Sequence, residues 1–551
     1  MLKNLIPAVD WMKSYKGSYL KGDLSAGLIV AIMLIPQGMA YAMLAGLPPV
    51  IGLYASTIPL IIYALFGSSK QLAVGPVAMV SLLVFSGVST LAEPGSSEYL
   101  SYALLLSLMV GVIQFGMGIF RLGFIVNFLS HAVISGFTSA AALIIGLSQL
   151  KHLLGVDIAR GSVFEVLYGA IVQIGNVNFI TLSIGALSIA ILLYFKKNYP
   201  RFPAALIVVV GGSLLVYFLN LQALGVSIVG EVPRGIPSIS LPAFDISSIT
   251  SLLPIALTIS FVGFMESIAV AKAIAAKEND KINSNQELSG LGLANIVGSF
   301  FSAYPVTGGF SRSAVNYQAG AKTGLASIIT AVLIIISLLF FTPLFYYLPN
   351  VVLAAIIMVA VFGLIDVKEA VHLFKIKKVD GWTLIVAFIA TLVTSIEEGI
   401  LIGIAFSLLV FIWRSAYPHV AQLGYIEQEN VFRNIKRYEN AKTFKDTIIF
   451  RIDASLYFAN MGFFEEQLRK EIADHPTTTK IVLDFSSVNA IDAVSIDELE
   501  KIIDDYKQAN IEILIAGMKG PVKDLVKRAD WESKYGKNIN YLSLQHALNL
   551  Q

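Results

Sequence analysis

The feature that most constrains this chain is a succession of long apolar stretches that ends near Tyr417. The first group covers residues 24–43, 50–66, 77–91, 100–119, 126–150, 180–195 and 204–219, and the second covers 252–271, 288–303, 311–319, 325–341, 345–362, 382–394 and 400–413. A helix needs about 20 apolar residues to cross a bilayer, so we predict a polytopic α-helical membrane protein with about 14 spans. The third and tenth stretches are short. Short stretches at corresponding places in two halves favour an inverted repeat with broken helices.

Composition and charge placement support this class. Hydrophobic residues make up 56% of the chain and charged residues 14%, and the formal net charge of +2 gives no reason to expect nucleic-acid binding. The predicted inner connections carry Lys70, Arg121, Lys196, Lys197, Arg201, Lys272, Lys277, Lys281, Lys322, Lys368, Lys375, Lys377, Lys378 and Arg414. The outer ones carry only Lys151, Arg160 and Arg234. Because basic residues stay on the cytoplasmic side, we expect both termini inside a bacterial-type inner membrane and an even number of spans.

The membrane part is flanked by two other segments. Residues 1–22 form a basic, aromatic segment without an apolar core, which is typical of a cytoplasmic interfacial segment and not of a signal peptide. Residues 23–417 form the predicted transmembrane domain, in which 220–250 is a linker. Residues 422–551 are charged and read as a soluble α/β domain, with strands at 447–452, 480–485 and 512–516 and helices at 463–472 and 495–507.

Polar residues interrupt the apolar pattern most clearly at 304–324. Pro305, Gly308 and Gly309 precede a small-residue segment that holds Ser311, Arg312 and Ser313, and the same stretch also carries Thr307 and Asn316. The pattern predicts a short helix whose N-terminal N–H groups and positive dipole end point at a ligand. A lipid-exposed arginine costs on the order of 3 kcal/mol, so Arg312 at this depth indicates an anion site. The alternative is that Arg312 caps a helix at the membrane surface.

A partly matching stretch lies in the first half. Gly75 and Pro76 precede a helix that begins near Val77, and the small Ala78 allows a ligand to approach the backbone. Two short helices with facing N-termini would offer an anion several N–H donors. The alternative is a Gly-Pro kink in an ordinary span.

Three further polar residues stand in apolar helices. Gln37 and Tyr41 lie four residues apart and can face one cavity, although Gln37 could instead hydrogen-bond to a neighbouring helix. Glu266 is the one convincing buried acid of the membrane core. Glu266 is either protonated, paired with Arg312, or alternates between these two states, and a proton-coupled carrier needs the alternation. The alternative is a permanent ion pair with Arg312 that only fixes packing. The chain has no cysteine, and its histidines form no cluster that would suggest a metal site. A nucleophile, a base and an orienting group, as an enzyme would need, do not occur together in the sequence.

At these residues the chain resembles the sulfate permease (SulP) family of anion transporters. The motifs are IPQGMAYAMLAGLPPVIGLY from Ile35, GPVAMVSLL from Gly75, FMESIAVAKAIA from Phe264 and GGFSRSAVNYQAGAKT from Gly308. The resemblance implies a seven-plus-seven inverted repeat with core and gate domains, two half-helices that meet at the membrane midplane, an elevator-like movement and a homodimer. It implies that the following residues bind the substrate: Gln37, Tyr41, Val77, Ala78, Ser311, Arg312 and Ser313. It assigns coupling to Glu266.

The C-terminal part resembles a STAS domain. In phosphorylated members of that fold a serine directly follows an aspartate at the start of a helix, whereas here Ala493 and Val494 follow Asp492, and Ser495 comes third. We therefore expect a scaffold or a docking surface for a cytoplasmic protein in place of a phosphorylation switch.

These inferences predict secondary active transport of an inorganic oxyanion, with proton-coupled sulfate uptake as the leading hypothesis. No cofactor is expected beyond the coupling ion, H⁺ or alternatively Na⁺. The alternatives are a bicarbonate or dicarboxylate carrier, an uncoupled anion channel, and an anion sensor that signals through the STAS domain.

Overall fold

The computed structural model describes residues 6–124, 130–159, 161–199, 202–242, 245–394 and 396–550. Arg160 and Arg201, which were counted among the basic residues of the connections, lie outside these residues. The chain divides into two compact units, Met1–Ser407 and Leu408–Gln551.

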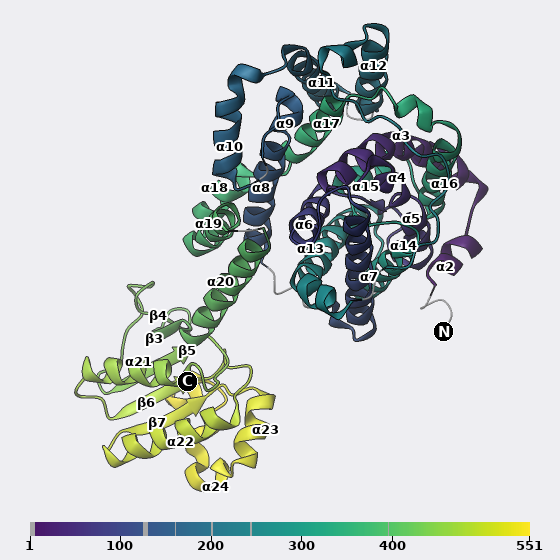
Figure 1. Ribbon diagram of the computed structural model, residues 1–551. Helices are drawn as coiled ribbons and strands as arrows, with labels where there is room; N and C mark the ends of the chain where they lie inside the picture. Colours follow the sequence, from purple (N-terminus) through teal and green to yellow (C-terminus); the bar gives the residue numbers. More distant parts are fainter. Residues whose placement is uncertain are drawn as a thin grey trace. The chain divides into compact units, whose positions relative to one another are not determined.

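The first unit begins with the short α2 (Ala8–Lys13) and contains two helical bundles. The first bundle consists of α3 (Leu20–Leu44), α4 (Pro49–Tyr54), α5 (Ile58–Phe66), α6 (Ala78–Val88), α7 (Ser97–Ile119), α13 (Ile246–Glu278), α14 (Ser284–Ser299), α15 (Phe310–Gln318) and α16 (Leu325–Phe340). In it, α14 packs against α7 and α5, and α3 packs against α16 (Figure 1). Glycine allows the closest of these contacts, because a Cβ atom at Gly111 of α7 would lie 2.6 Å from the Ile296 backbone nitrogen of α14.

The second bundle lies beside the first. It consists of α8 (His131–Ser148), α9 (Leu150–Leu154), α10 (Val163–Val172), α11 (Phe179–Asn198), α12 (Ala204–Phe218), α17 (Asn350–Phe362), α18 (Val367–Ile376), α19 (Lys378–Val393) and α20 (Ile396–Ala416), which crosses into the second unit. Here α19 packs on α8, and α11 packs on α17. The bundles meet where α3 contacts α17 and α12, and where α6 contacts α8.

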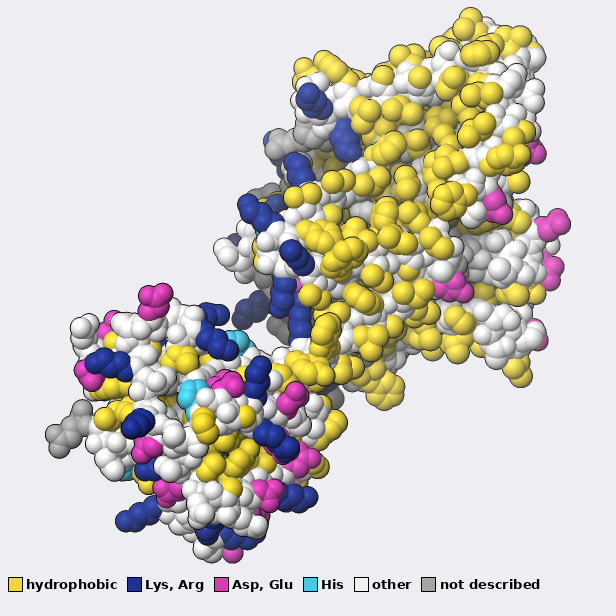
Figure 2. Space-filling model, turned by 90° about the vertical axis from the view of Figure 1, so that its left-hand side faces the viewer, with side chains coloured by type: hydrophobic (Ala, Val, Ile, Leu, Met, Phe, Trp, Pro, Cys, Tyr) yellow, Lys and Arg dark blue, Asp and Glu magenta, His cyan; other side chains and the backbone are white. Residues whose placement is uncertain are grey.

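The first unit has the character of a multi-pass membrane protein. Among the described residues, eight helices are long and apolar enough to cross a bilayer, and four shorter apolar helices accompany them. Figure 2 shows hydrophobic side chains over most of the visible face of this unit, with Lys and Arg along one edge and Asp and Glu along the opposite one. This separation of charge agrees with the predicted sidedness of the connections. The total of 14 spans and the inverted repeat stay predictions.

Most predicted helix positions are close to the observed ones, with two informative differences. The span predicted over 50–66 coincides with the membrane-length segment Pro49–Phe66, but its helical backbone is interrupted at Thr57 between α4 and α5. Pro59 sits in the first turn of α5, where its missing N–H costs nothing, and so marks a new start. The helix predicted from residue 345 begins only at Asn350, after Pro349 in an extended conformation.

The second unit is a five-stranded sheet with strand order β4-β3-β5-β6-β7. The strands are β3 (Val420–Ile426), β4 (Val431–Asn434), β5 (Thr447–Ile452), β6 (Lys480–Asp484) and β7 (Glu512–Ala516). The predicted strands at β5, β6 and β7 are confirmed and pair in parallel. The prediction missed β3 and β4, which form an antiparallel extension beside β5.

Helices complete this unit: α21 (Met461–Ala473), α22 (Ala493–Gln508), α23 (Gly520–Arg528), α24 (Trp531–Tyr535) and α25 (Leu544–Ala547). Phe450, Phe464 and Leu499 are fully buried in its core. Asp492 caps α22 by accepting a hydrogen bond from the Ser495 backbone nitrogen at 2.8 Å. Ser495 itself is fully buried, and the absence of a phosphorylation switch stays a prediction.

Candidate anion-binding site

Two very short strands bring the two short helices together. β1 (Val74–Gly75) pairs antiparallel with β2 (Thr307–Gly308), in the register Val74 to Gly308 and Gly75 to Thr307. β1 leads into α6, which has 11 residues, and β2 leads into α15, which has 9. Since both helices begin just after the paired strands, their N-termini meet at one place, as the sequence pattern predicted.

The helix starts at this meeting point present backbone donors. Val77 is the N-cap of α6 and Ala78 its first residue, and Gly309 is the N-cap of α15. Neither N-cap supplies a side-chain oxygen, so the first-turn N–H groups have no side-chain cap. Phe310 and Ser311 are exposed at the first turn of α15. Uncapped N–H groups and the positive ends of two helix dipoles favour an oxyanion.

Arg312 lies directly behind these helix starts. It is 2% exposed, and its Nη1 donates to the carbonyl oxygen of Pro76. Its Nε and Nη2 are buried without a hydrogen-bond partner among the described residues. A Cβ atom at Gly309 would lie 2.8 Å from Nη2, so this glycine makes room for the guanidinium. Arg312 is therefore no surface cap, and it supplies positive charge with unused donors.

Gln37 and Tyr41 lie on α3, which packs against both α6 and α15. Their exposed fractions are 8% and 6%. No described residue forms a hydrogen bond with either side chain, so Gln37 does not serve as a tie to a neighbouring helix. Two buried polar groups without protein partners are suited to bind a ligand.

Glu266 approaches from α13, which packs on α6 and α15. Its Oε2 is buried without a partner, and within the described residues it forms no ion pair with Arg312. A permanent ion pair that fixes packing is therefore not observed. An unsatisfied carboxylate oxygen near a buried arginine can take up a proton or a cation.

Ser313 and Asn316 face the other way. The Ser313 Oγ accepts a hydrogen bond from the Ala73 backbone nitrogen at 2.9 Å, and the Asn316 Nδ2 donates to the Gln71 carbonyl oxygen at 2.9 Å. Both contacts tie α15 to the segment that leads into β1. The hydroxyl of Ser313, which the resemblance assigned to the substrate, thus has a structural partner.

Polar residues that the sequence analysis did not single out hold β2 in place. Asn295 of α14 pairs with both backbone groups of Val306: its Oδ1 accepts from the nitrogen at 2.8 Å and its Nδ2 donates to the oxygen at 3.1 Å. Ser267 of α13 accepts from the Gly308 backbone nitrogen at 2.8 Å. A lone Asn in an apolar helix was the available signal, because such residues usually bond across helices.

Two further buried carboxylates correct the expectation that Glu266 is alone. Asp23 and Glu287 are both fully buried. Asp23 accepts from the backbone nitrogens of Lys322 and Thr323 at 2.7 and 3.1 Å, and from the Thr323 hydroxyl at 2.7 Å. Glu287 accepts from Tyr63, Ser68 and Ser69 at 2.6 to 2.9 Å. The two carboxylates fasten the connections next to α15 and β1.

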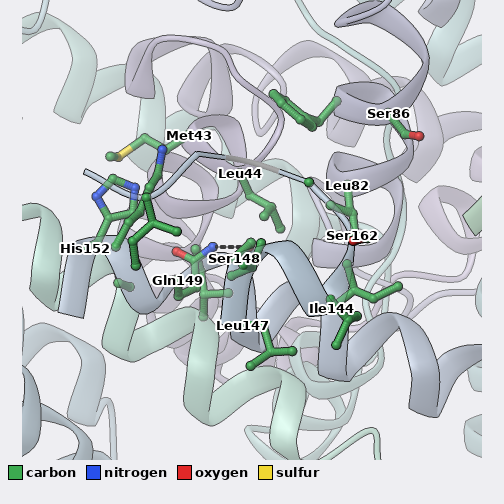
Figure 3. A pocket seen from close by; sticks show the side chains of 18 of the residues that line it. Met43, Leu44, Leu82, Ser86, Ile144, Leu147, Ser148, Gln149, His152 and Ser162 are labelled. Carbon is green, nitrogen blue, oxygen red and sulfur yellow. Dashed lines mark hydrogen bonds between the residues drawn. The ribbon is translucent and has the colours of Figure 1, made fainter. Parts of the chain in front are cut away.

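A cavity of about 460 Å³ lies between the two bundles. Figure 3 shows Met43 and Leu44 from α3, Leu82 and Ser86 from α6, and Ile144, Leu147 and Ser148 from the end of α8. Gln149, which follows α8, lies beside them, with His152 and Ser162 nearby. The Gln149 Nε2 donates to the Ser148 hydroxyl at 2.9 Å. None of the predicted binding residues lines this cavity, although Ala40 and Met43 of its lining flank Tyr41 on α3.

Comparisons with known proteins agree with this architecture. The model of the sulfate permease family matches residues 20–387, and that of the STAS domain matches residues 438–540. Sulfate transporter 4.1, chloroplastic, of Arabidopsis thaliana is 40% identical over 570 residues, which cover 100% of this chain and 83% of the relative.

Solved structures show the same fold. Murine Solute Carrier 26 family member A9, an anion transporter in the inward-facing state, superposes with a TM-score of 0.91 at 26% identity, over 100% of this chain and 94% of that one. The transmembrane domain of the cyanobacterial bicarbonate transporter BicA matches with a TM-score of 0.62 at 23% identity, over 71% of this chain and 98% of that one. The chain is thus a membrane anion transporter, not an enzyme, and belongs to the sulfate permease family with a C-terminal STAS domain.

Proposed function

We propose that this protein imports sulfate, or a similar tetrahedral oxyanion, by coupling its movement to protons. The observation that carries the proposal is Arg312, a buried arginine behind two helix N-termini that the paired strands bring together. Its Nε and Nη2 have no hydrogen-bond partner among the described residues. Guanidinium and backbone N–H groups are the preferred donors to sulfate and phosphate oxygens. In the proposed site the first turns of α6 and α15, with Gln37, Tyr41 and Ser311, contact the anion.

The relatives support the choice of anion class. The Arabidopsis relative is named a sulfate transporter and aligns along this whole chain. Bicarbonate and dicarboxylates remain competitors in the experiment below, because a site made of N–H donors accepts any small anion.

Charge explains why coupling is needed. Each elementary charge that crosses the membrane against the potential costs about 2.3 kcal/mol per 100 mV, so a dianion entering an inside-negative cell costs roughly twice that. In our proposal Glu266 carries one proton with the anion. One proton cancels half of the electrical cost, and the pH and sulfate gradients supply the rest.

The two bundles supply the moving parts of the proposed elevator. α3, α6, α13 and α15 all belong to the first bundle, so the whole anion site would move with it against the second. The cavity between the bundles leaves space at their interface. We place both termini in the cytoplasm and the protein in the inner membrane, because of the basic inner connections. The proposed homodimer rests on the family resemblance alone.

Uptake of radiolabelled sulfate into proteoliposomes tests this function. We expect accumulation when an inward proton gradient is imposed and its loss when the gradient is collapsed, with bicarbonate, fumarate and chloride as weaker competitors. A sodium gradient in place of the proton gradient is the control for the coupling ion. Sulfate uptake that does not change with either the proton or the sodium gradient would contradict the proposed ion coupling. No sulfate uptake under any condition would contradict the proposal that sulfate is the substrate.

A further inference from the structure

The cytoplasmic unit contains a pocket of about 250 Å³ at the antiparallel edge of its sheet. It is lined by His419, Arg433, Asn434, Arg437, Tyr438, Arg451 and Asp453. These residues come from β3, β4 and β5 or from positions adjoining them, and the strands are neighbours in the order β4-β3-β5. Three arginines and a histidine thus surround a single carboxylate.

One side of the pocket is neutralised by that carboxylate. Asp453 accepts hydrogen bonds from the Nε and Nη2 of Arg451 at 2.6 and 3.1 Å and shares one with the His419 Nδ1 at 2.8 Å. Burial alone would raise the pKa of Asp453, but the hydrogen bonds from Arg451 and His419 hold it below its ordinary value. Asp453 is therefore ionised, and it fixes the direction of the Arg451 guanidinium.

The other side keeps its positive charge. The Arg433 guanidinium lies over the ring of Tyr438, 5.8 Å from its centre. The backbone nitrogen of Arg437 donates a hydrogen bond to the Asn434 carbonyl oxygen at 3.0 Å. This turn follows directly after Arg433, and both arginines line the pocket. In the described part of the chain, no carboxylate pairs with either Arg433 or Arg437. Like charges that converge without a counter-ion repel one another, and an anion between them removes that repulsion.

We propose that this pocket binds a tetrahedral oxyanion, contacted by Arg433 and Arg437 and bordered by Tyr438. Guanidinium groups present paired N–H donors that match sulfate and phosphate oxygens. At about 30 Å³ per water molecule, the pocket holds such an ion with several waters. The oxyanion is either free in solution or the phosphate of an anionic lipid headgroup.

A lipid headgroup could reach the pocket because the pocket lies close in sequence to the end of the last predicted membrane helix. His419 follows the end of α20 at Ala416 by three residues, and three residues span at most about 10 Å. A free ion would instead make the domain sensitive to cytoplasmic sulfate or phosphate. The site does not depend on the proposed transport function, because none of its residues belongs to the membrane site.

Backbone hydrogen exchange on the full-length protein in nanodiscs tests the proposal, read out at residues 431–438. In one arm, inorganic phosphate and then sulfate are added in purely zwitterionic lipid. In the other arm, phosphatidylglycerol replaces part of the lipid and no ion is added. Slower exchange in the first arm identifies a free oxyanion, and slower exchange in the second identifies a headgroup. Unchanged exchange in both arms would overturn the proposal.

Variants show whether the arginines carry the effect. Arg433→Gln combined with Arg437→Gln should abolish the protection, and the corresponding double Lys variant should keep most of it. The matched control is Arg469→Gln, since Arg469 is an arginine of the same unit that already pairs with Glu465 at 2.5 Å. Protection that persists in the double Gln variant would also overturn the proposal. Because Arg433 and Arg437 are exposed, all these variants should fold, which gel filtration and thermal melting check.

Discussion

Carboxylates with buried oxygen atoms occur at two kinds of place in the first bundle, and their surroundings differ sharply. At the first turns of α3 and α14, Asp23 and Glu287 each accept four hydrogen bonds from backbone and side-chain donors. Beside the paired half-helices, Glu266 accepts none from the described residues and leaves Oε2 buried without a partner. A saturated carboxylate is a structural element, whereas an unsatisfied one can exchange its charge.

The polar side chains around the paired half-helices fall into the same two groups: some hold the backbone in place, and others have polar groups left for the anion. Asn295 and Ser313 use their polar groups to bind the backbone next to β1 and β2. Asn316 does so only with its Nδ2, and its Oδ1 is buried without a partner among the described residues. Arg312 keeps its Nε and Nη2, and Gln37 its amide, without a hydrogen-bond partner in the part of the chain that the structure describes. The first set should matter for stability and the second for the anion.

The largest effect is expected from Glu287→Ala. It leaves buried donors of Tyr63, Ser68 and Ser69 without an acceptor, and each such donor costs about 1–3 kcal/mol. We therefore expect a loss of several kcal/mol and little folded protein, measured by the thermal melting of detergent-purified samples. Glu266→Ala is the matched control and should melt close to the wild type. Equal melting of the two variants would remove the distinction between saturated and unsatisfied carboxylates.

The next effect is the loss of coupling in Glu266→Gln. A neutral amide cannot cycle a proton, so accumulation driven by the pH gradient should disappear, a difference of roughly tenfold per pH unit for each coupled proton. Exchange of labelled for unlabelled sulfate should continue, since binding does not need the carboxylate. Full gradient-driven accumulation by this variant would show that another group carries the proton.

A smaller effect is expected from Gln37→Leu. A hydrogen bond to a charged group contributes about 1.5–3 kcal/mol, so its loss should weaken sulfate binding by roughly tenfold or more. The melting temperature should not fall, because the Gln37 amide forms no hydrogen bond with any residue that the structure describes. An unchanged dissociation constant would place Gln37 outside the site.

The smallest effect is expected from Ser313→Ala. It removes the acceptor of the Ala73 N–H, which should lower stability by about 1 kcal/mol and change sulfate affinity by less than roughly threefold. Thermal melting measures the effect on stability, and equilibrium binding of sulfate to the same sample measures the effect on affinity. A large loss of affinity with unchanged melting would return Ser313 to the anion contacts.

Local chemistry explains what the sequence could predict. The prolines and glycines before Val77 and Phe310 predicted two short helices, and the apolar strands at β5 to β7 were recognisable by their pattern. β3 was missed because Gln422 and Gly424 interrupt its apolar residues, and β4 because it is only four residues long. The antiparallel pairing of β1 with β2 joins residues more than 200 positions apart, which no local pattern reports.

The hydrogen bonds to the buried carboxylates could not be predicted for the same reason, because their donors are distant in sequence. The donors to Glu287 lie 218 to 224 residues away, and Lys322 lies 299 residues from Asp23. In sequence, each of these acids looks like Glu266, a lone charge near or within an apolar helix. Only the folded chain shows which of them already has partners.

The most direct test of the anion site is equilibrium binding of radiolabelled sulfate to purified Arg312→Gln. The measurement is made in the Arg433→Gln and Arg437→Gln background, so that the cytoplasmic pocket does not contribute. Removing a buried charge that contacts an opposite charge costs about 2–5 kcal/mol, so we predict affinity at least about 30-fold weaker, with Arg312→Lys in between. Unchanged affinity in a folded Arg312→Gln protein would contradict the site at the paired half-helices.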